Sequence, residues 1–173
     1  MSSNNPIRQL ALAAMFLALA LVLPFVTGQI PQIGGALCPM HLPVLLCGFF
    51  CDPLFALAVG AIAPLLRFFL FGMPPLLPTG LAMSLELATY GLTAAMLSRR
   101  LPRTRWGLFL ALLGAMLAGR AVWGVASALI FGIRGTGFGW KLFFMGAFGN
   151  AIPGIALQML LIPQLVYAIA RKK

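Results

Sequence analysis

Four titratable side chains lie inside or at the ends of long apolar stretches of this chain: His41, Arg67, Glu86 and Arg120. Charged groups are costly inside a bilayer, so such residues are rare there and usually serve function. When the apolar stretches are threaded through a membrane, all four residues fall in the same half of it. This coincidence predicts a site that binds a polar small molecule from one side of a membrane.

Catalysis has little support from the same residue types. The chain has one histidine and two acidic residues. It lacks the HExxH pattern, the GxSxG motif and any cluster of aspartates that could hold a metal. It also lacks a Walker A motif, so we expect that the chain does not itself hydrolyse ATP. We therefore expect no catalytic residues, no cofactor and no metal site.

Three further side chains lie near these groups in depth. Tyr90 follows Glu86 by four residues, so both share one helical face. Trp123 lies about one turn beyond Arg120, and Asn150 lies about 15 Å down the last apolar stretch. Trp123 can also be ordinary packing, and Asn150 can bridge two helices. The candidate substrate-binding set is Arg120, Glu86, Tyr90, Trp123, Asn150, Arg67 and His41.

The charged residues of this set also have structural alternatives. Arg67 and Glu86 lie on neighbouring stretches and can neutralise each other, or Arg67 can extend to the membrane surface. His41 begins its stretch and can be a residue of the membrane interface. If Glu86 pairs with Arg67, Arg120 has no protein counter-charge. A bound anion would then supply one, which makes Arg120 the favoured ligand contact.

The composition identifies the class of protein that must position these residues. Of 173 residues, 62% are hydrophobic and 8% are charged, and the mean hydropathy is +1.04. Soluble domains carry about 25% charged residues, so we expect an all-α integral membrane protein with one domain over residues 1–173. The net charge of +10 does not predict nucleic-acid binding, because most basic residues flank apolar stretches.

Six transmembrane helices are expected, since a spanning helix needs about 20 apolar residues. The second is short, and Asp52-Pro53 separates it from the third as a natural stop and restart. The first resembles a signal peptide, but its apolar run exceeds the usual length, so we expect a retained helix. The expected spans are 9–27, 40–51, 53–72, 80–98, 106–133 and 140–169.

Basic residues set the expected orientation, because they accumulate on the cytoplasmic side. With both termini in the cytoplasm, eight basic residues lie inside and only Arg134 and Lys141 flank the outer side. The outer connections, residues 28–39, 72–80 and 134–139, are rich in glycine or proline and poor in charge. They are expected either to lie over the site as lids or to be tight connectors.

The stretch MHLPVLLCGFFCDPLFALAVGAIAPLLRFFLFGMPPLLPTGLAMSLELATYGLTAAML, residues 40–97, carries a family resemblance that extends over nearly the whole chain. It resembles the substrate-binding S component of an energy-coupling factor (ECF) transporter. The resemblance implies a vitamin binder in a prokaryotic plasma membrane. Its partners would be a transmembrane coupling protein and two cytoplasmic ATPases. The family's AxxxA docking pattern matches Ala14 and Ala18, and Ala11 extends the same face.

Several substrates fit the resemblance. Two arginines and one histidine against one glutamate favour a carboxylate-bearing substrate, and pantothenate is the first choice. Folate, lipoate, a B6 compound and a queuosine precursor are the other candidates. Two classes remain as alternatives: a membrane scaffold or assembly protein whose polar residues join helices, and a membrane enzyme.

Overall fold

The computed structural model describes residues 5–26, 37–102, 104–133, 139 and 151–171, and the described part contains helices and no strand. Five of these helices are long and apolar enough to cross a membrane. A sixth, α3, has only ten residues, so the expected six spans appear as five plus this shorter helix. The elements are α1 (Pro6–Val26), α3 (His41–Phe50), α4 (Pro53–Phe71), η1 (Leu76–Gly80), α5 (Leu81–Arg100), α6 (Arg105–Ile133) and α8 (Ile152–Arg171).

Local sequence explains several of these boundaries. The predicted break at Asp52-Pro53 is confirmed, because α3 ends at Phe50 and Pro53 opens α4. Proline suits the first position of a helix, where its missing N–H costs no hydrogen bond. Gly72 ends α4 with a φ of 71°, a left-handed conformation that glycine adopts without strain. The described part of the last span begins at Ile152, and residues 140–150 lie outside the described residues.

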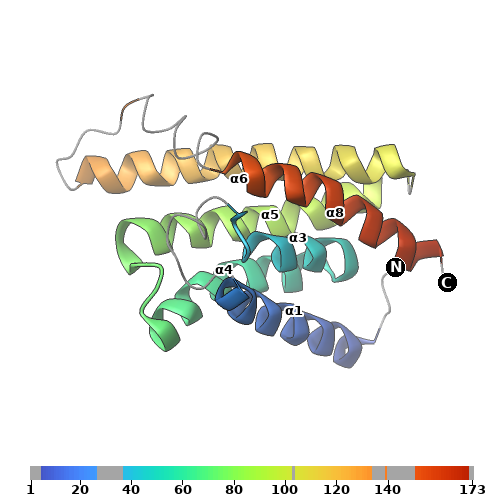
Figure 1. Cartoon of the computed structure of the whole chain (residues 1–173), viewed down its shortest axis with the longest axis horizontal. Helices are drawn as coiled ribbons and strands as arrows, with labels where there is room; N and C mark the ends of the chain where they lie inside the picture. The colour runs from blue at the N-terminus through green and yellow to red at the C-terminus, as the bar shows by residue number, and fades with distance from the viewer. Residues whose placement is uncertain (1–4, 27–36, 103, 134–138, 140–150, 172–173) are drawn as a thin grey trace.

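Helix α5 lies at the centre of the bundle and contacts α3, α4 and α6. In Figure 1, α6 runs along one edge and α1 along the opposite edge, with α3, α4 and α5 between them. Two glycines allow a close approach of α4 and α5. A Cβ at Gly60 would lie 2.2 Å from the Leu87 carbonyl oxygen, and one at Gly91 would lie 2.3 Å from that of Ala56. Small residues of this kind let membrane helices approach at backbone distance.

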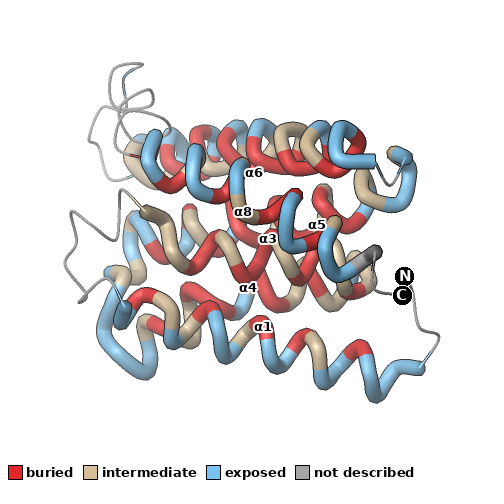
Figure 2. Tube along the Cα trace, turned by 45° about the vertical axis from the view of Figure 1, so that its right-hand side comes forward, coloured by how far each residue is buried: buried red, intermediate tan, exposed pale blue. Residues whose placement is uncertain are grey.

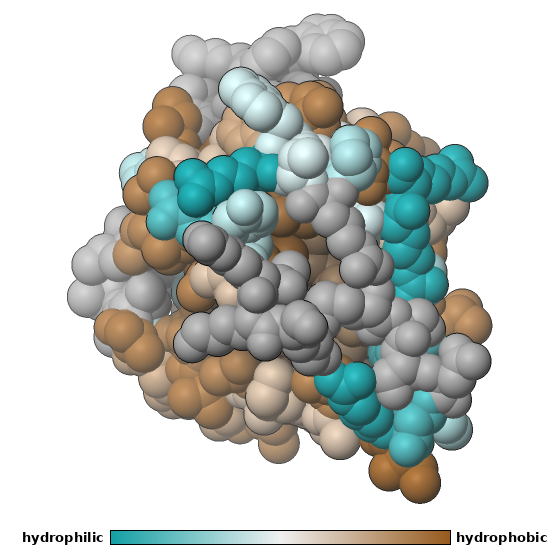
Figure 3. Space-filling view, turned by 90° about the vertical axis from the view of Figure 1, so that its right-hand side faces the viewer, coloured by the Kyte–Doolittle hydropathy of each residue, from teal (hydrophilic) through white to brown (hydrophobic). Residues whose placement is uncertain are grey.

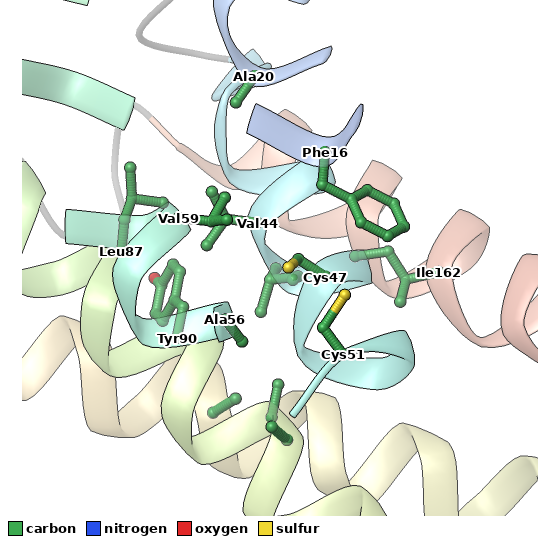
Figure 4. Close-up of a cluster of buried hydrophobic side chains, with 14 of the residues drawn as sticks. Phe16, Ala20, Val44, Cys47, Cys51, Ala56, Val59, Leu87, Tyr90 and Ile162 are labelled. Atoms are coloured by element: carbon green, nitrogen blue, oxygen red, sulfur yellow. The ribbon is translucent and has the colours of Figure 1, made fainter. Parts of the chain in front are cut away.

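The apolar core joins the helices around α3. Figure 4 shows Phe16 of α1 and Ile162 of α8 on the same side of α3 as Cys47. Figure 2 shows buried residues turned toward the middle of the bundle and exposed ones on its outer faces. Many of the exposed residues are large and apolar, such as Leu54 and Ile133. An outer surface of this kind suits lipid rather than water, in agreement with a multi-pass membrane protein.

The start of α1 and the end of α8 lie at one end of the bundle (Figure 1). We call it the basic end, defined by Arg8, Arg99, Arg100 and Arg105. Figure 3 looks onto this end, where hydrophilic side chains form separate patches between hydrophobic flanks. An ion pair between Asp52 and Arg99 joins the α3–α4 junction to α5. The Asp52 backbone N–H also donates to the Gln9 side-chain oxygen at 3.0 Å, which ties α1 to the same junction.

Candidate functional site

Glu86 is the centre of a buried polar cluster formed by three helices. Its side chain is 1% exposed, and its Oε1 lies 3.0 Å from Nη1 of Arg120 on α6. The Tyr90 hydroxyl donates to the same oxygen at 2.9 Å. His41, the first residue of α3, places its Nε2 3.8 Å from it. We call His41, Glu86, Tyr90 and Arg120 the polar cluster. Four of the seven predicted binding residues therefore meet at one point.

The local structure explains why these side chains meet. Glu86 and Tyr90 are four residues apart on α5, so they share one face of the helix as predicted. The His41 ring packs edge-on against the Tyr90 ring, with centroids 5.5 Å apart. Gly119 of α6 faces Tyr90 from the other side. A Cβ there would lie 2.1 Å from Cδ1 and Cε1 of the tyrosine, so only glycine leaves room for the ring in this position.

Three buried nitrogen atoms of the cluster have no hydrogen-bond partner among the described residues. They are Nδ1 and Nε2 of His41 and Nε of Arg120. A buried polar atom left unpaired costs about 1–3 kcal/mol, so such atoms are normally satisfied. With a neutral His41, the charges of Glu86 and Arg120 cancel. The cluster can therefore supply hydrogen-bond donors and an acceptor to a ligand without carrying a net charge.

Two residues that the sequence did not assign to the site also lie near the polar cluster, Cys38 in the segment before α3 and Gln158 on α8. Cys38 lies close enough to Arg120 and Glu86 for their charges to act on its thiol, and burial raises the pKa of that thiol. Gln158 of α8 donates from Nε2 to the Cys38 carbonyl oxygen at 3.3 Å. It lies only six residues beyond the start of α8 at Ile152, so it reaches the side that holds the cluster.

Arg67 lies apart from the cluster and has a different partner. Its Nη1 donates to the Leu21 carbonyl oxygen of α1 at 2.7 Å. Its guanidinium also lies 5.3 Å and 5.5 Å from the ring centroids of Phe25 and Phe71. The pairing of Arg67 with Glu86, considered from the sequence, is therefore wrong, because this face of α4 turns toward α1. The inference that Arg120 lacks a protein counter-charge fails with it, since Glu86 supplies one.

The remaining predicted site residues are placed only in part. Trp123 is half-buried on α6, three residues beyond Arg120. Asn150 lies outside the described residues, as do residues 28–36 of the first predicted loop. In the second loop, η1 contacts α4, α5 and α6, so this connection packs on the bundle. No group of three or more His, Cys, Asp or Glu residues that could hold a metal ion occurs in the described ranges.

The predicted docking residues all lie on one helix. Ala11, Ala14 and Ala18 are exposed on α1, whereas Ala13 and Ala20 of the same helix are buried in the core. The alanine face is therefore open to a neighbour in the membrane. Small residues at this spacing are those that permit close helix contact.

Comparison with known proteins gives one match. The family model described as "ECF transporter, substrate-specific component" matches residues 8–170. No curated protein and no solved structure matches the chain. The match includes residues of every helix of the described part and all of the three helices that form the polar cluster.

Proposed function

The chain belongs to the family of substrate-specific components of ECF transporters, and from this premise we propose that the polar cluster is its substrate-binding site. A protein of this family is a transport component and not an enzyme. The proposed role is to capture a small polar micronutrient, such as a vitamin, in the plasma membrane. Partner subunits would then hydrolyse ATP to drive its uptake.

The observation that supports this site is the set of unpaired nitrogen atoms on His41 and Arg120. Both side chains are at least nine-tenths buried, and they come from different helices. Glu86 and Tyr90 hold them in place from α5. A substrate that offers an acceptor to Arg120 Nε and a polar edge to His41 would satisfy these atoms, so binding would remove a cost that the empty site bears.

The substrate itself is the finer part of the proposal. The case for a carboxylate-bearing substrate such as pantothenate was based on two arginines and one histidine against one glutamate. Arg67 lies apart from the cluster and Glu86 neutralises Arg120, so the cluster favours an uncharged polar group at this point. Folate, lipoate, a B6 compound and a queuosine precursor remain candidates, and binding of each compound can be tested directly. Any carboxylate of the substrate would have to bind elsewhere, and Trp123 and Asn150 would be its contacts.

The orientation and the partners complete the proposal. Basic residues accumulate on the cytoplasmic side of membrane proteins, so the basic end would face the cytoplasm. Glu86 lies 14 residues before Arg100, about 21 Å further along α5, so the polar cluster would lie toward the outer surface. The exposed face of Ala11, Ala14 and Ala18 would contact the transmembrane coupling protein. Labelling of Leu76→Cys but not Leu101→Cys from outside, in a background without the native cysteines, would support this orientation; the reverse would overturn it.

The decisive experiment is mass spectrometry of small molecules released from the purified protein, followed by calorimetric titration of the compound found. We expect one compound per chain, with His41→Ala weakening its binding at least tenfold. Gln164→Ala is the matched control, because Gln164 is an exposed polar residue outside the cluster. If no compound is released and none of the five candidate substrates raises the unfolding temperature, the polar residues only join helices and the scaffold alternative is favoured.

A further inference from the structure

A groove at the basic end lies far from the polar cluster. Its volume is about 880 Å³. It lies between the first residue of α6 and the second half of α8, two helices that contact each other. Arg105 of α6 is 15 residues from Arg120, about 22 Å along the helix. The lining includes Arg105, Leu161, Pro163, Gln164, Leu165 and Tyr167.

Arg105 is a cation for which the described residues provide no carboxylate. The whole chain has two acidic residues, and both pair with other arginines, Asp52 with Arg99 and Glu86 with Arg120. The guanidinium carbon of Arg105 instead lies 4.9 Å from the centroid of the Tyr167 ring on α8. This contact orients the guanidinium in the groove and leaves its N–H groups available for an anion.

The walls of the groove suit a lipid. Leu161, Pro163 and Leu165 form an apolar surface along α8, and Leu165 is exposed on the outside of the bundle. Trp106, next to Arg105, is 74% exposed. Exposed tryptophan and tyrosine residues mark the level at which lipid headgroups meet the hydrocarbon region. The groove therefore combines a cation at headgroup level with an apolar wall that continues away from it.

We propose that this groove binds one anionic phospholipid. The phosphodiester would accept hydrogen bonds from the planar guanidinium of Arg105, which suits phosphate oxygens. One acyl chain would lie along Leu161 and Leu165. Basic pockets between membrane helices at the cytoplasmic surface bind anionic headgroups in this way. Charge complementarity favours this occupant over a zwitterionic lipid, because no acidic residue of the described chain is left to neutralise Arg105.

The test is native mass spectrometry of the full chain, purified in a neutral detergent and titrated with phosphatidylglycerol or with phosphatidylcholine of the same acyl chains. We expect one phosphatidylglycerol to bind more tightly than phosphatidylcholine. Arg105→Gln should weaken it about fivefold, the effect of one basic residue at a membrane surface. Arg8→Gln is the matched control, since it removes the same charge at the same end outside the groove, and it should have less than half that effect.

A second variant keeps Arg105 and blocks the apolar wall. Leu165→Trp should lower phosphatidylglycerol binding at least threefold, and Leu165 is exposed, so the fold should tolerate the change. The proposal is overturned if phosphatidylcholine binds as tightly, or if Arg8→Gln and Arg105→Gln weaken binding equally. It is also overturned if free glycerol 3-phosphate at the same concentration displaces the lipid, because the site would then bind an anion without its acyl chain.

Discussion

The buried pair of Glu86 and Arg120 gives the sharpest test of the structure. Removing one partner of a buried ion pair costs about 3–5 kcal/mol, because the other charge stays buried without compensation. Glu86→Gln and Arg120→Gln should each destabilise the protein by this amount. The double variant leaves no buried charge, so its cost should be similar to that of one single variant. The resulting coupling energy is about 3–5 kcal/mol, at or above the upper end of about 3 kcal/mol for contacting residues.

The second ion pair of the described chain provides an internal control. Asp52 and Arg99 have side chains that are 33% and 41% exposed, and exposed pairs contribute about 0.2–1 kcal/mol. The corresponding double-mutant cycle, made with Asp52→Asn and Arg99→Gln, should therefore give a coupling energy below about 1 kcal/mol. Both cycles can be measured by reversible unfolding in mixed detergent micelles. If the two single costs at Glu86 and Arg120 simply add, the residues do not act as a pair and the proposed site geometry is wrong.

Three further changes test other parts of the structure. Gly119→Ala should displace the Tyr90 ring and weaken substrate binding about tenfold or more, measured by calorimetric titration; unchanged affinity would show that the ring position does not matter. Arg67→Ala should cost about 1.5–3 kcal/mol of stability through its lost bond to the Leu21 carbonyl while the folded protein binds substrate normally, and a binding defect at full stability would place Arg67 in the site. Ala14→Trp should leave binding by the isolated protein intact and abolish uptake in cells, whereas loss of both would indicate misfolding.

The sequence was a good guide to the depth of residues and a poor one to the direction in which they face. Helical rise alone placed Glu86 and Arg120 at similar depth, and the four-residue spacing placed Tyr90 beside Glu86. Arg67 met the same criterion of depth but faces α1 instead of α5. The direction of a side chain around its helix depends on how neighbouring helices pack, and the uniformly apolar sequence around Arg67 carries no periodic signal for it.

Gln158 shows a related limit. The last span was expected over residues 140–169, whereas the described helix begins at Ile152, so Gln158 lies near the start of its helix. A long apolar stretch does not by itself show where a helix within it begins. The contact of Gln158 with the Cys38 carbonyl also joins positions 120 residues apart. No local pattern encodes a contact at that separation.

The close approach of α4 and α5 at Gly60 and Gly91 has a mechanical consequence. Backbones that meet without intervening side chains cannot slide past each other in small steps, since tightly packed interfaces change between discrete arrangements. These two helices should therefore move as one rigid body during a transport cycle. Opening a path to Glu86 would then fall to an element that contacts this body less closely, and α8 is such an element because its contacts are mainly with α6 and α3. Hydrogen exchange should accordingly be slowest along α5 and fastest, among the helices, in α8.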